Sequence, residues 1–332
     1  MRGYIYYPPR TPVVAFPATG HASGLRHVAR IRHSNLLKNL YKCVFIFLCR
    51  YDSVRTKIAR ELSEELLSIE SAIESIVCID EVISEPVFLL SRSKLDKKII
   101  IFQSNGQSLL CKVALDERSV LLVRNEARAL QRLEVSRFNF SHPDFVSEGE
   151  IANGYYVIQS VVGGESVLPP QEEQVIEIIS ELTNGRRDVK ISHLVDLQEF
   201  ISNYQLNDVI SDVSSLIDEI DTVLISSATE HGDLTENNFV GNSLVDWEYF
   251  DSCGSSFFDL ISYLLNIGIP YGELPQYLSD NNRYQAYIRR CINGNQDIVR
   301  TIQLVTLVQF ARTCIRKELA VSYTHLTLPT KA

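Results

Sequence analysis

The spacing of apolar residues changes several times along this chain. Residues 53–78 carry apolar side chains at helical spacing, with charged residues on the other face, and we predict one surface helix there. Short apolar runs follow at 86–92, 97–103 and 108–115. Turn-like segments, SKLD and SNGQ, separate these runs, which is typical of a three-stranded antiparallel meander.

A helical pattern at 118–134 and a strand pattern at 154–167 complete this β-rich part, and the strand ends in a Gly-Gly break. From residue 171 onward helical patterns dominate. They cover residues 171–183, 193–202, 206–221, 257–267, 283–293 and 295–319. We therefore predict an α+β chain with a small antiparallel β-rich N-lobe and a larger helical C-lobe, joined by a hinge near residues 160–166.

One stretch interrupts the helical part. Residues 231–250 read HGDLTENNFVGNSLVDWEYF, and two short apolar runs flank Gly241-Asn242, a pair typical of tight hairpin turns. The polar residues gather at the start of the stretch, and the chain's only tryptophan, Trp247, follows an aspartate. We interpret Trp247 as a packing residue and the polar residues around it as a candidate site.

The composition bounds the function. The 332 residues are 45% hydrophobic and 22% charged, which suits a globular protein with a sizeable core. A formal net charge of −9 argues against a nucleic-acid partner. Seven scattered cysteines without CxxC spacing favour neither disulfides nor zinc, and they suggest a reducing cytoplasm. The apolar run at 43–49 is far shorter than the roughly 20 residues of a membrane span.

Charge is unevenly distributed along the chain. Residues 1–51 hold eight Lys or Arg and no Asp or Glu, while the remainder holds 24 basic and 41 acidic residues. Three interpretations of this basic arm stay open: a solvated leader, an Arg-rich transit peptide, or an arm that contacts anionic lipid or an acidic partner. The last of these implies peripheral membrane contact.

The final residues, 321–332, read VSYTHLTLPTKA and are similar to the translation of a sequencing adapter. We expect this tail to be an artefact and the natural C-terminus to be missing. The predicted organisation is therefore a basic arm plus helix of unknown role at 1–80, a β-rich N-lobe at 81–162, a helical C-lobe at 163–320, and the artefact tail.

The stretch at 231–250 holds the groups that phosphoryl transfer needs. A turn at Gly241-Asn242 would bring Asp246 back toward Asp233 and Asn238. Two carboxylates and an amide oxygen are hard ligands that suit Mg²⁺. A carboxylate that does not bind the metal can orient or deprotonate a hydroxyl, and ATP would supply the phosphate.

A lysine for the nucleotide phosphates is also present. Lys112 lies in the predicted strand at 108–115, and Glu126 lies in the helix at 118–134. A strand lysine held by a helix glutamate is the ion pair with which kinases fix the α- and β-phosphates.

The order of these parts resembles the aminoglycoside phosphotransferase and choline kinase group of small-molecule kinases. The group's motif, HGDxxxxN followed by a strand that ends in Asp, is matched by HGDLTENN (231–238) and LVDWEY (244–249). The resemblance covers roughly residues 85–320. It implies a two-lobed protein kinase-like fold and ATP-dependent transfer to a small-molecule hydroxyl.

The resemblance implies a role for each matched residue. Asp233 would be the catalytic aspartate, Asn238 and Asp246 would hold Mg²⁺, and Lys112 with its partner Glu126 would bind the α- and β-phosphates. Ser160 and Val162 would bind adenine through nearby backbone groups. His231 would position the loop, and Asp259 would brace it.

Two functions from different classes remain open at this stage. The first is a phosphotransferase whose acceptor is a sugar, an amino alcohol, an aminoglycoside or an envelope saccharide. The alternative is a non-catalytic nucleotide-binding module that regulates a partner and keeps the kinase-like fold. Acidic residues at 207–221 either suit a cationic acceptor or form the solvated face of a helix.

Overall fold

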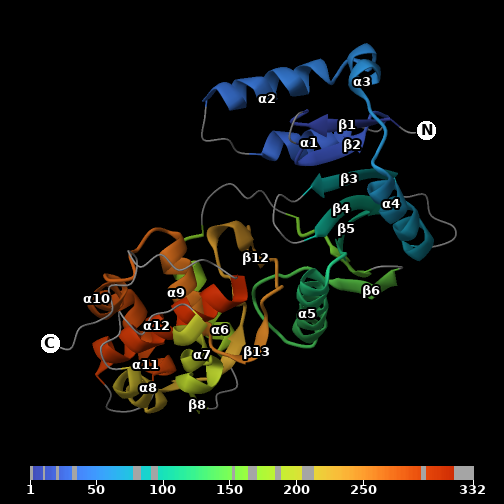
Figure 1. Cartoon of the computed structure of the whole chain (residues 1–332). Coiled ribbons are helices and arrows are strands. Elements are labelled where there is room, and N and C mark those ends of the chain that lie inside the picture. The colour runs from blue at the N-terminus through green and yellow to red at the C-terminus, as the bar shows by residue number, and fades with distance from the viewer. Residues whose placement is uncertain are drawn as a thin grey trace. The chain divides into compact units, whose positions relative to one another are not determined.

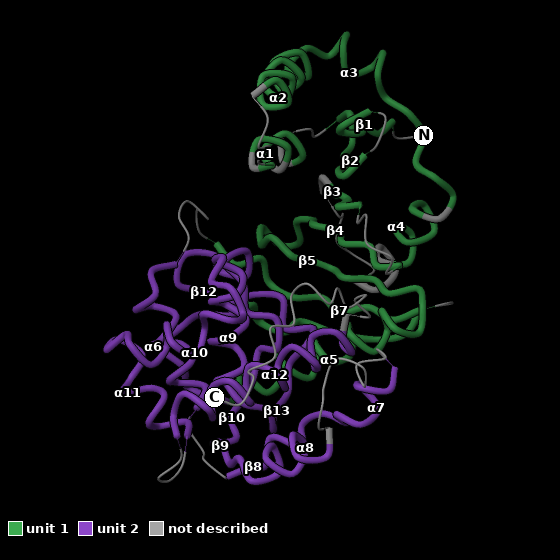
Figure 2. Tube along the Cα trace, turned by 60° about the vertical axis from the view of Figure 1, so that its left-hand side comes forward, with its two compact units in different colours: residues 1–135, 143–163 green, residues 136–142, 164–332 purple. Residues whose placement is uncertain are grey.

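The structure is a computed structural model. It describes residues 3–9, 12–19, 22–31, 36–77, 84–90, 96–151, 154–163, 170–183, 188–203, 213–292 and 297–317. The tail at 321–332 lies outside these residues. The chain forms two compact units, shown in green and purple in Figure 2. Unit 1 comprises residues 1–135 and 143–163, and unit 2 comprises residues 136–142 and 164–332.

Unit 1 is built on an antiparallel sheet of seven strands, in the order β1-β2-β3-β4-β5-β7-β6 (Figure 1). Its strands are β1 (Tyr4–Tyr7), β2 (Val14–Pro17), β3 (Ser84–Leu90), β4 (Lys97–Ser104), β5 (Gln107–Ala114), β6 (Phe145–Ile151) and β7 (Gly154–Ser160). The predicted three-stranded meander is confirmed as β3, β4 and β5. β6 was not predicted, because its sequence FVSEGEI alternates weakly and half of it is polar.

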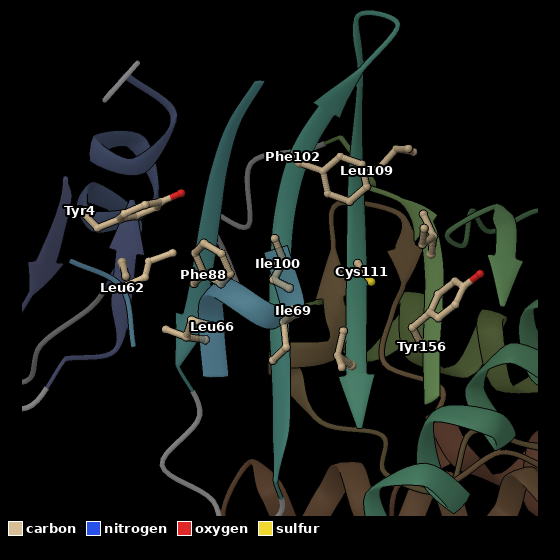
Figure 3. Close-up of a cluster of buried hydrophobic side chains, with 13 residues drawn as sticks. Tyr4, Leu62, Leu66, Ile69, Phe88, Ile100, Phe102, Leu109, Cys111 and Tyr156 are labelled. Atoms are coloured by element: carbon tan, nitrogen blue, oxygen red, sulfur yellow. The ribbon is translucent and has the colours of Figure 1, made fainter. Parts of the chain in front are cut away.

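Alternation of side chains along each strand creates two apolar faces on this sheet. One face packs against helix α4 (Glu64–Val77), whose Leu66 and Ile69 contact a cluster that includes Phe88 and Ile100 (Figure 3). The opposite face is covered in two places. Helices α1 (Ala22–Arg30) and α2 (Leu36–Leu48) cover it near β1 to β3, and α5 (Glu117–Glu134) covers it near β5 and β7.

The basic arm is part of unit 1, and the solvated-leader interpretation is wrong for its described residues. β1 and β2 pair with each other, and β2 pairs with β3, so the arm extends the sheet. Ile5 and Phe16 are fully buried in the cluster beneath α1 and α2. Burial of these apolar side chains is what a folded segment shows.

The single helix predicted at 53–78 is two helices, α3 (Asp52–Ile58) and α4, separated by residues 59–63. Ala59 is extended, and Arg60 forms a β-bridge with Tyr4 through hydrogen bonds of 2.7 and 2.8 Å. The apolar spacing is continuous across the break. A tertiary contact with β1 therefore overrides the local helical pattern.

Unit 2 is mainly helical, as predicted. Its helices are α6 (Glu172–Leu182), α7 (Leu197–Asn203), α8 (Val213–Asp221), α9 (Ser256–Asn266), α10 (Leu274–Asp280), α11 (Asn282–Cys291) and α12 (Ile298–Lys317). Short two-stranded pairs join them: β8 (Asp188–Lys190) with β9 (Leu224–Ser226), β10 (Ala228–Glu230) with β13 (Asp251–Gly254), and β11 (Phe239–Val240) with β12 (Ser243–Leu244). α10 and most of these short strands were not predicted from the sequence. The two-lobed α+β architecture is confirmed.

α12 is the one helix among the described residues that is long and apolar enough to cross a membrane. However, 61% of its apolar window is buried in unit 2, where the helix packs against α9 and α10. Its Arg312 is also buried and paired with Glu230. These contacts are those of a core helix.

Candidate active site

The predicted ion pair of unit 1 is present. Asp116 caps the N-terminus of α5 by accepting hydrogen bonds from the backbone of Arg118 and Ser119. Val123 and Ala127 of this helix then pack against β5 and β7, which turns Glu126 toward the sheet. Lys112 Nζ lies 2.7 Å from Glu126 Oε2, and the two side chains are 4% and 0% exposed. The pair is therefore withdrawn from water.

The segment predicted to bind adenine follows β7. The Ser160 backbone N–H donates to the Asp144 carbonyl at 3.0 Å, and its hydroxyl bonds to the Asp144 side chain and backbone. Val161 N–H donates to the Ser108 carbonyl. Val162 makes no backbone hydrogen bond to another residue in the described ranges. Of the two predicted adenine contacts, Ser160 already uses its backbone N–H within unit 1.

In unit 2, His231 connects the loop that carries Asp233 to the segment that carries Asp246. Its Nδ1 accepts a long hydrogen bond from the Asp233 backbone N–H at 3.4 Å. The proton must then lie on Nε2, which donates to the Val245 carbonyl at 3.0 Å. The ring is fully buried against Trp247. Both ring nitrogens of His231 are therefore engaged in hydrogen bonds that connect the loop to Val245.

Asn238 closes this arrangement. Its side-chain N–H donates to the Asp233 carbonyl at 2.7 Å, and its own carbonyl accepts from the Val245 N–H at 2.9 Å. Since the amide nitrogen must be the group that faces a carbonyl, the side-chain oxygen is left to face away from it. The structure thus brings Asp233, Asn238 and the residue before Asp246 into one hydrogen-bonded ring.

Asp246 has a left-handed backbone, with φ of 68°. This conformation is uncommon for residues other than glycine, though Asp and Asn tolerate it best. The strand that the resemblance implies up to Asp246 is shorter in the structure. β12 ends at Leu244, and the Trp247 indole N–H donates back to the Leu244 carbonyl at 3.0 Å. The predicted hairpin turn at Gly241-Asn242 is confirmed between β11 and β12.

The side-chain oxygen atoms of Asn238, Asp246 and Glu248 fit a divalent cation. A carboxylate oxygen of Asp246 lies within 4.8 Å of one from Glu248, which is 5% exposed. Two carboxylates at this separation repel each other unless a cation or a proton lies between them. The side-chain oxygen of Asn238 is the same kind of hard ligand. Asn238 and Asp246, with Glu248 in support, are therefore a donor set that suits Mg²⁺.

A buried network holds the loop from behind. Asp259, at the start of α9, accepts the backbone N–H groups of His231 and Gly232, each at 2.8 Å. Burial and the neighbouring Glu230 raise the pKa of Asp259 well above its ordinary value, and these two hydrogen bonds oppose the rise. The loop is thus fixed through its backbone at the two residues that precede Asp233.

Sequence reasoning missed Glu230, Arg312 and Arg316. Glu230 is fully buried and accepts from Arg312 at 2.9 Å, from Arg316 at 3.0 Å and from the Ser255 backbone at 3.1 Å. Burial would raise the pKa of Glu230, but the two guanidinium groups outweigh it and lower the pKa. The available signal was two arginines, four residues apart, in the C-terminal half of α12, among mainly apolar residues.

Other predicted residues have ordinary roles. Trp247 is fully buried and stacks against Phe140, as a packing residue should. In the acidic segment 207–221, Glu219 pairs with Arg300 at 2.5 Å. Asp221 pairs with Lys190 at 2.8 Å, and this contact lowers the pKa of Asp221. Both of these carboxylates are therefore engaged inside unit 2.

The chain matches no protein-family model and no curated protein sequence. Among solved structures it is similar to the GDP and kanamycin complex of APH(2'')-IIIa, with 15% identity, 75% of this chain and 93% of that chain covered, and a TM-score of 0.49. It is also similar to the aminoglycoside phosphotransferase APH(4)-Ia, with 12% identity, coverage of 77% and 100%, and a TM-score of 0.45. A third similar structure is APH(3'')-Id from Streptomyces rimosus in complex with ADP and streptomycin. Its sequence identity is 13%, the match covers 64% of this chain and 90% of that chain, and the TM-score is 0.39. The chain thus has a likeness of fold to aminoglycoside phosphotransferases, and at these identities the likeness concerns the fold alone.

Proposed function

We propose that the chain is an ATP-dependent phosphotransferase that transfers the γ-phosphate to a hydroxyl group of a small molecule. Lys112, held by Glu126, would bind the α- and β-phosphates. The backbone at Val162 would bind adenine. Asn238 and Asp246 would hold Mg²⁺, which neutralises phosphate charge when bound. Asp233 would orient the acceptor hydroxyl and take its proton.

The buried Lys112–Glu126 pair carries this proposal. Removing two charges from water costs several kcal/mol per ion, and apolar residues of similar volume often give equal or higher stability. Lys112 and Glu126 are 4% and 0% exposed, so they bear this cost in full. The presence of these two charges in a core otherwise made of Val, Ala and Tyr is better explained by a role in phosphate binding than by a contribution to stability.

The loop at 231–238 supports the same conclusion. Its hydrogen bonds fix backbone groups and the His231 ring, so the loop gives Asp233 a rigid support. Positioning a hydroxyl and removing its proton needs a carboxylate on a rigid support. A proton transfer of this kind accelerates a reaction by about 10² to 10⁴-fold.

The acceptor class stays open among sugars, amino alcohols, aminoglycosides and envelope saccharides. The described acidic residues of 213–221 lend little support to a cationic acceptor, because Glu219 and Asp221 already pair with Arg300 and Lys190. A cytoplasmic setting fits both the use of ATP and the cysteine pattern.

The test is phosphate transfer from ATP in the presence of Mg²⁺, across a panel of amino alcohols, sugars and aminoglycosides that includes kanamycin and streptomycin. We expect transfer to one acceptor class. Asp233→Asn should lower the rate by about 10² to 10⁴-fold while ATP still binds. Asp280→Asn, an exposed substitution on α10, is the matched control and should leave the rate unchanged.

Two outcomes would contradict the proposal. If ATP binds with Mg²⁺ but no acceptor is phosphorylated, the non-catalytic nucleotide-binding module becomes the better interpretation. If ATP does not bind at all, the proposed nucleotide role of Lys112 is wrong.

A further inference from the structure

Helix α2 exposes a row of large apolar side chains. Six residues at spacings of one, three and four form this row, and they are 43 to 61% exposed: Leu40, Tyr41, Val44, Phe47, Leu48 and Tyr51. This spacing places them along one side of the helix and its C-terminal end. We call these six residues the apolar stripe. Contiguous apolar surface of this kind marks an interaction site on most proteins.

The opposite side of α2 is fixed to unit 1. Phe45 and Cys49 are buried in the cluster over β1 and β2, and the Phe45 ring lies 4.8 Å from that of Tyr7. Lys42 Nζ donates to the carbonyls of Ala29 and Ile31, at the end of α1, at 3.1 and 2.6 Å. The helix already has its core face, so the apolar stripe is its outer face.

Charge selects the partner. Residues 1–51 contain eight basic and no acidic residues, and Arg26, Lys38 and Arg50 are exposed. A symmetric dimer through the apolar stripe would bring this positive charge against itself. An anionic lipid surface complements both properties, since its headgroups attract Lys and Arg and its acyl boundary accepts apolar side chains.

We propose that the apolar stripe of α2 inserts into the interface of an anionic lipid bilayer, with the exposed Arg26, Lys38 and Arg50 on the lipid headgroups. The remaining chain is acidic and is repelled by the same surface. The repulsion acts only over a Debye length of about 8 Å at physiological salt, so it orients the protein without preventing contact. This proposal does not depend on the kinase activity.

The test is flotation of the whole chain with vesicles of phosphatidylcholine, with and without phosphatidylglycerol. The stripe variant is Leu40→Asn/Phe47→Asn. Its matched control is Leu121→Asn/Val135→Asn, which changes two apolar residues on and after α5 that are more exposed than the stripe pair. A charge variant, Lys38→Gln/Arg50→Gln, separates the electrostatic part. Thermal unfolding verifies that each variant is folded. The six substituted positions of the three variants are all exposed, so we expect the fold to be retained.

We expect the wild type to float with phosphatidylglycerol vesicles and to bind more weakly as salt is raised. The partition coefficient of the stripe variant onto these vesicles should be about a hundredfold lower than that of the wild type, because each of the two substituted side chains contributes about tenfold. The charge variant should lose binding to anionic vesicles, and the matched control should behave as wild type. The proposal is overturned if the wild type binds no vesicle, if the matched control loses as much binding, or if the stripe variant only dissociates a dimer.

Discussion

The substitution Glu230→Gln removes one buried charge without changing the shape of the side chain. In the wild type, the Glu230 carboxylate accepts hydrogen bonds from Arg312, Arg316 and the Ser255 backbone. Gln retains one acceptor oxygen and replaces the other with an N–H₂ group. That group faces donors, so at least one of the three bonds becomes a donor-to-donor contact.

The expected loss of stability is about 3 kcal/mol. Breaking a buried pair by removal of one partner costs about 3 to 5 kcal/mol, since the other charge is left uncompensated. Two features place the value at the lower end. Asp251 lies 3.7 Å from Arg312 and 4.0 Å from Arg316, and it retains part of the compensation. The Glu230 charge also helps to raise the pKa of Asp259. Its loss therefore removes a repulsion between two neighbouring carboxylates.

The pH dependence has a definite sign. Because the pKa of Glu230 is lower in the folded state than its ordinary value of 4.5, the carboxylate stabilises the fold above that pH. This contribution is lost as pH falls through the lowered folded pKa. The difference in stability between wild type and Glu230→Gln should therefore be full at neutral pH and shrink below about pH 4.5.

Thermal unfolding followed by circular dichroism measures the effect. For a unit of this size, about 3 kcal/mol corresponds to a fall in Tm of roughly 6 to 12 °C. Asp251→Asn is the control, because this aspartate is 36% exposed and lies farther from the guanidinium groups. The reasoning is refuted if Glu230→Gln lowers Tm no more than Asp251→Asn does, or if the difference persists unchanged at acid pH.

Three further predictions concern the candidate site. Lys112→Met should reduce phosphate transfer by about a hundredfold and destabilise unit 1, because Glu126 is left as a buried charge. The double variant Lys112→Met/Glu126→Leu should recover the wild-type Tm but not the rate of phosphate transfer. Recovery of both would contradict the proposed role of Lys112. Gly232→Ala should destabilise unit 2 by about 2 kcal/mol in denaturant titration, since φ is +83° and the new Cβ would lie 2.2 Å from the Tyr249 carbonyl; an unchanged midpoint would show that the loop adapts. Asp246→Asn should lower transfer about a hundredfold at fixed Mg²⁺ with an unchanged Tm, because Asn also tolerates the left-handed backbone, and full activity would exclude Asp246 as a ligand.

The β-rich part of unit 1 was predictable because its chemistry is local. β3, β4 and β5 are apolar runs separated by short polar turns, and the helix α5 begins at an Asp that caps it. Lys112 and Glu126 were paired correctly because both lie on neighbouring elements of regular geometry. Their role with a nucleotide stays a prediction.

The parts that could not be predicted depend on contacts between distant residues. The break between α3 and α4 follows from the bridge between Arg60 and Tyr4. The support of the loop at 231–238 depends on Arg312, which lies 82 residues after Glu230. A buried arginine in an apolar helix indicates that a carboxylate lies nearby, but the sequence offers 41 candidates.

The geometry of Asp246 was hidden for a different reason. Its neighbours Leu244, Val245 and Trp247 are apolar, and their pattern predicts a continuous strand. The left-handed backbone arises from the return of the Trp247 side chain to Leu244 and from the bonds that Val245 makes to His231 and Asn238. Pattern reasoning finds the residue types of such a site, and tertiary bonds decide its shape.

The pairing of β2 with β3 has a consequence for how the protein folds during synthesis. Val14 pairs with Leu89, so the first two strands cannot join the sheet until β3 has left the ribosome. At about 5 to 20 residues per second, that delay is about 4 to 15 s. During this time Ile5 and Phe16, which end fully buried, have no sheet to cover them. The N-terminal segment is therefore the part of the nascent chain that most needs a chaperone, and closing so long a loop is expected to be a slow step in refolding.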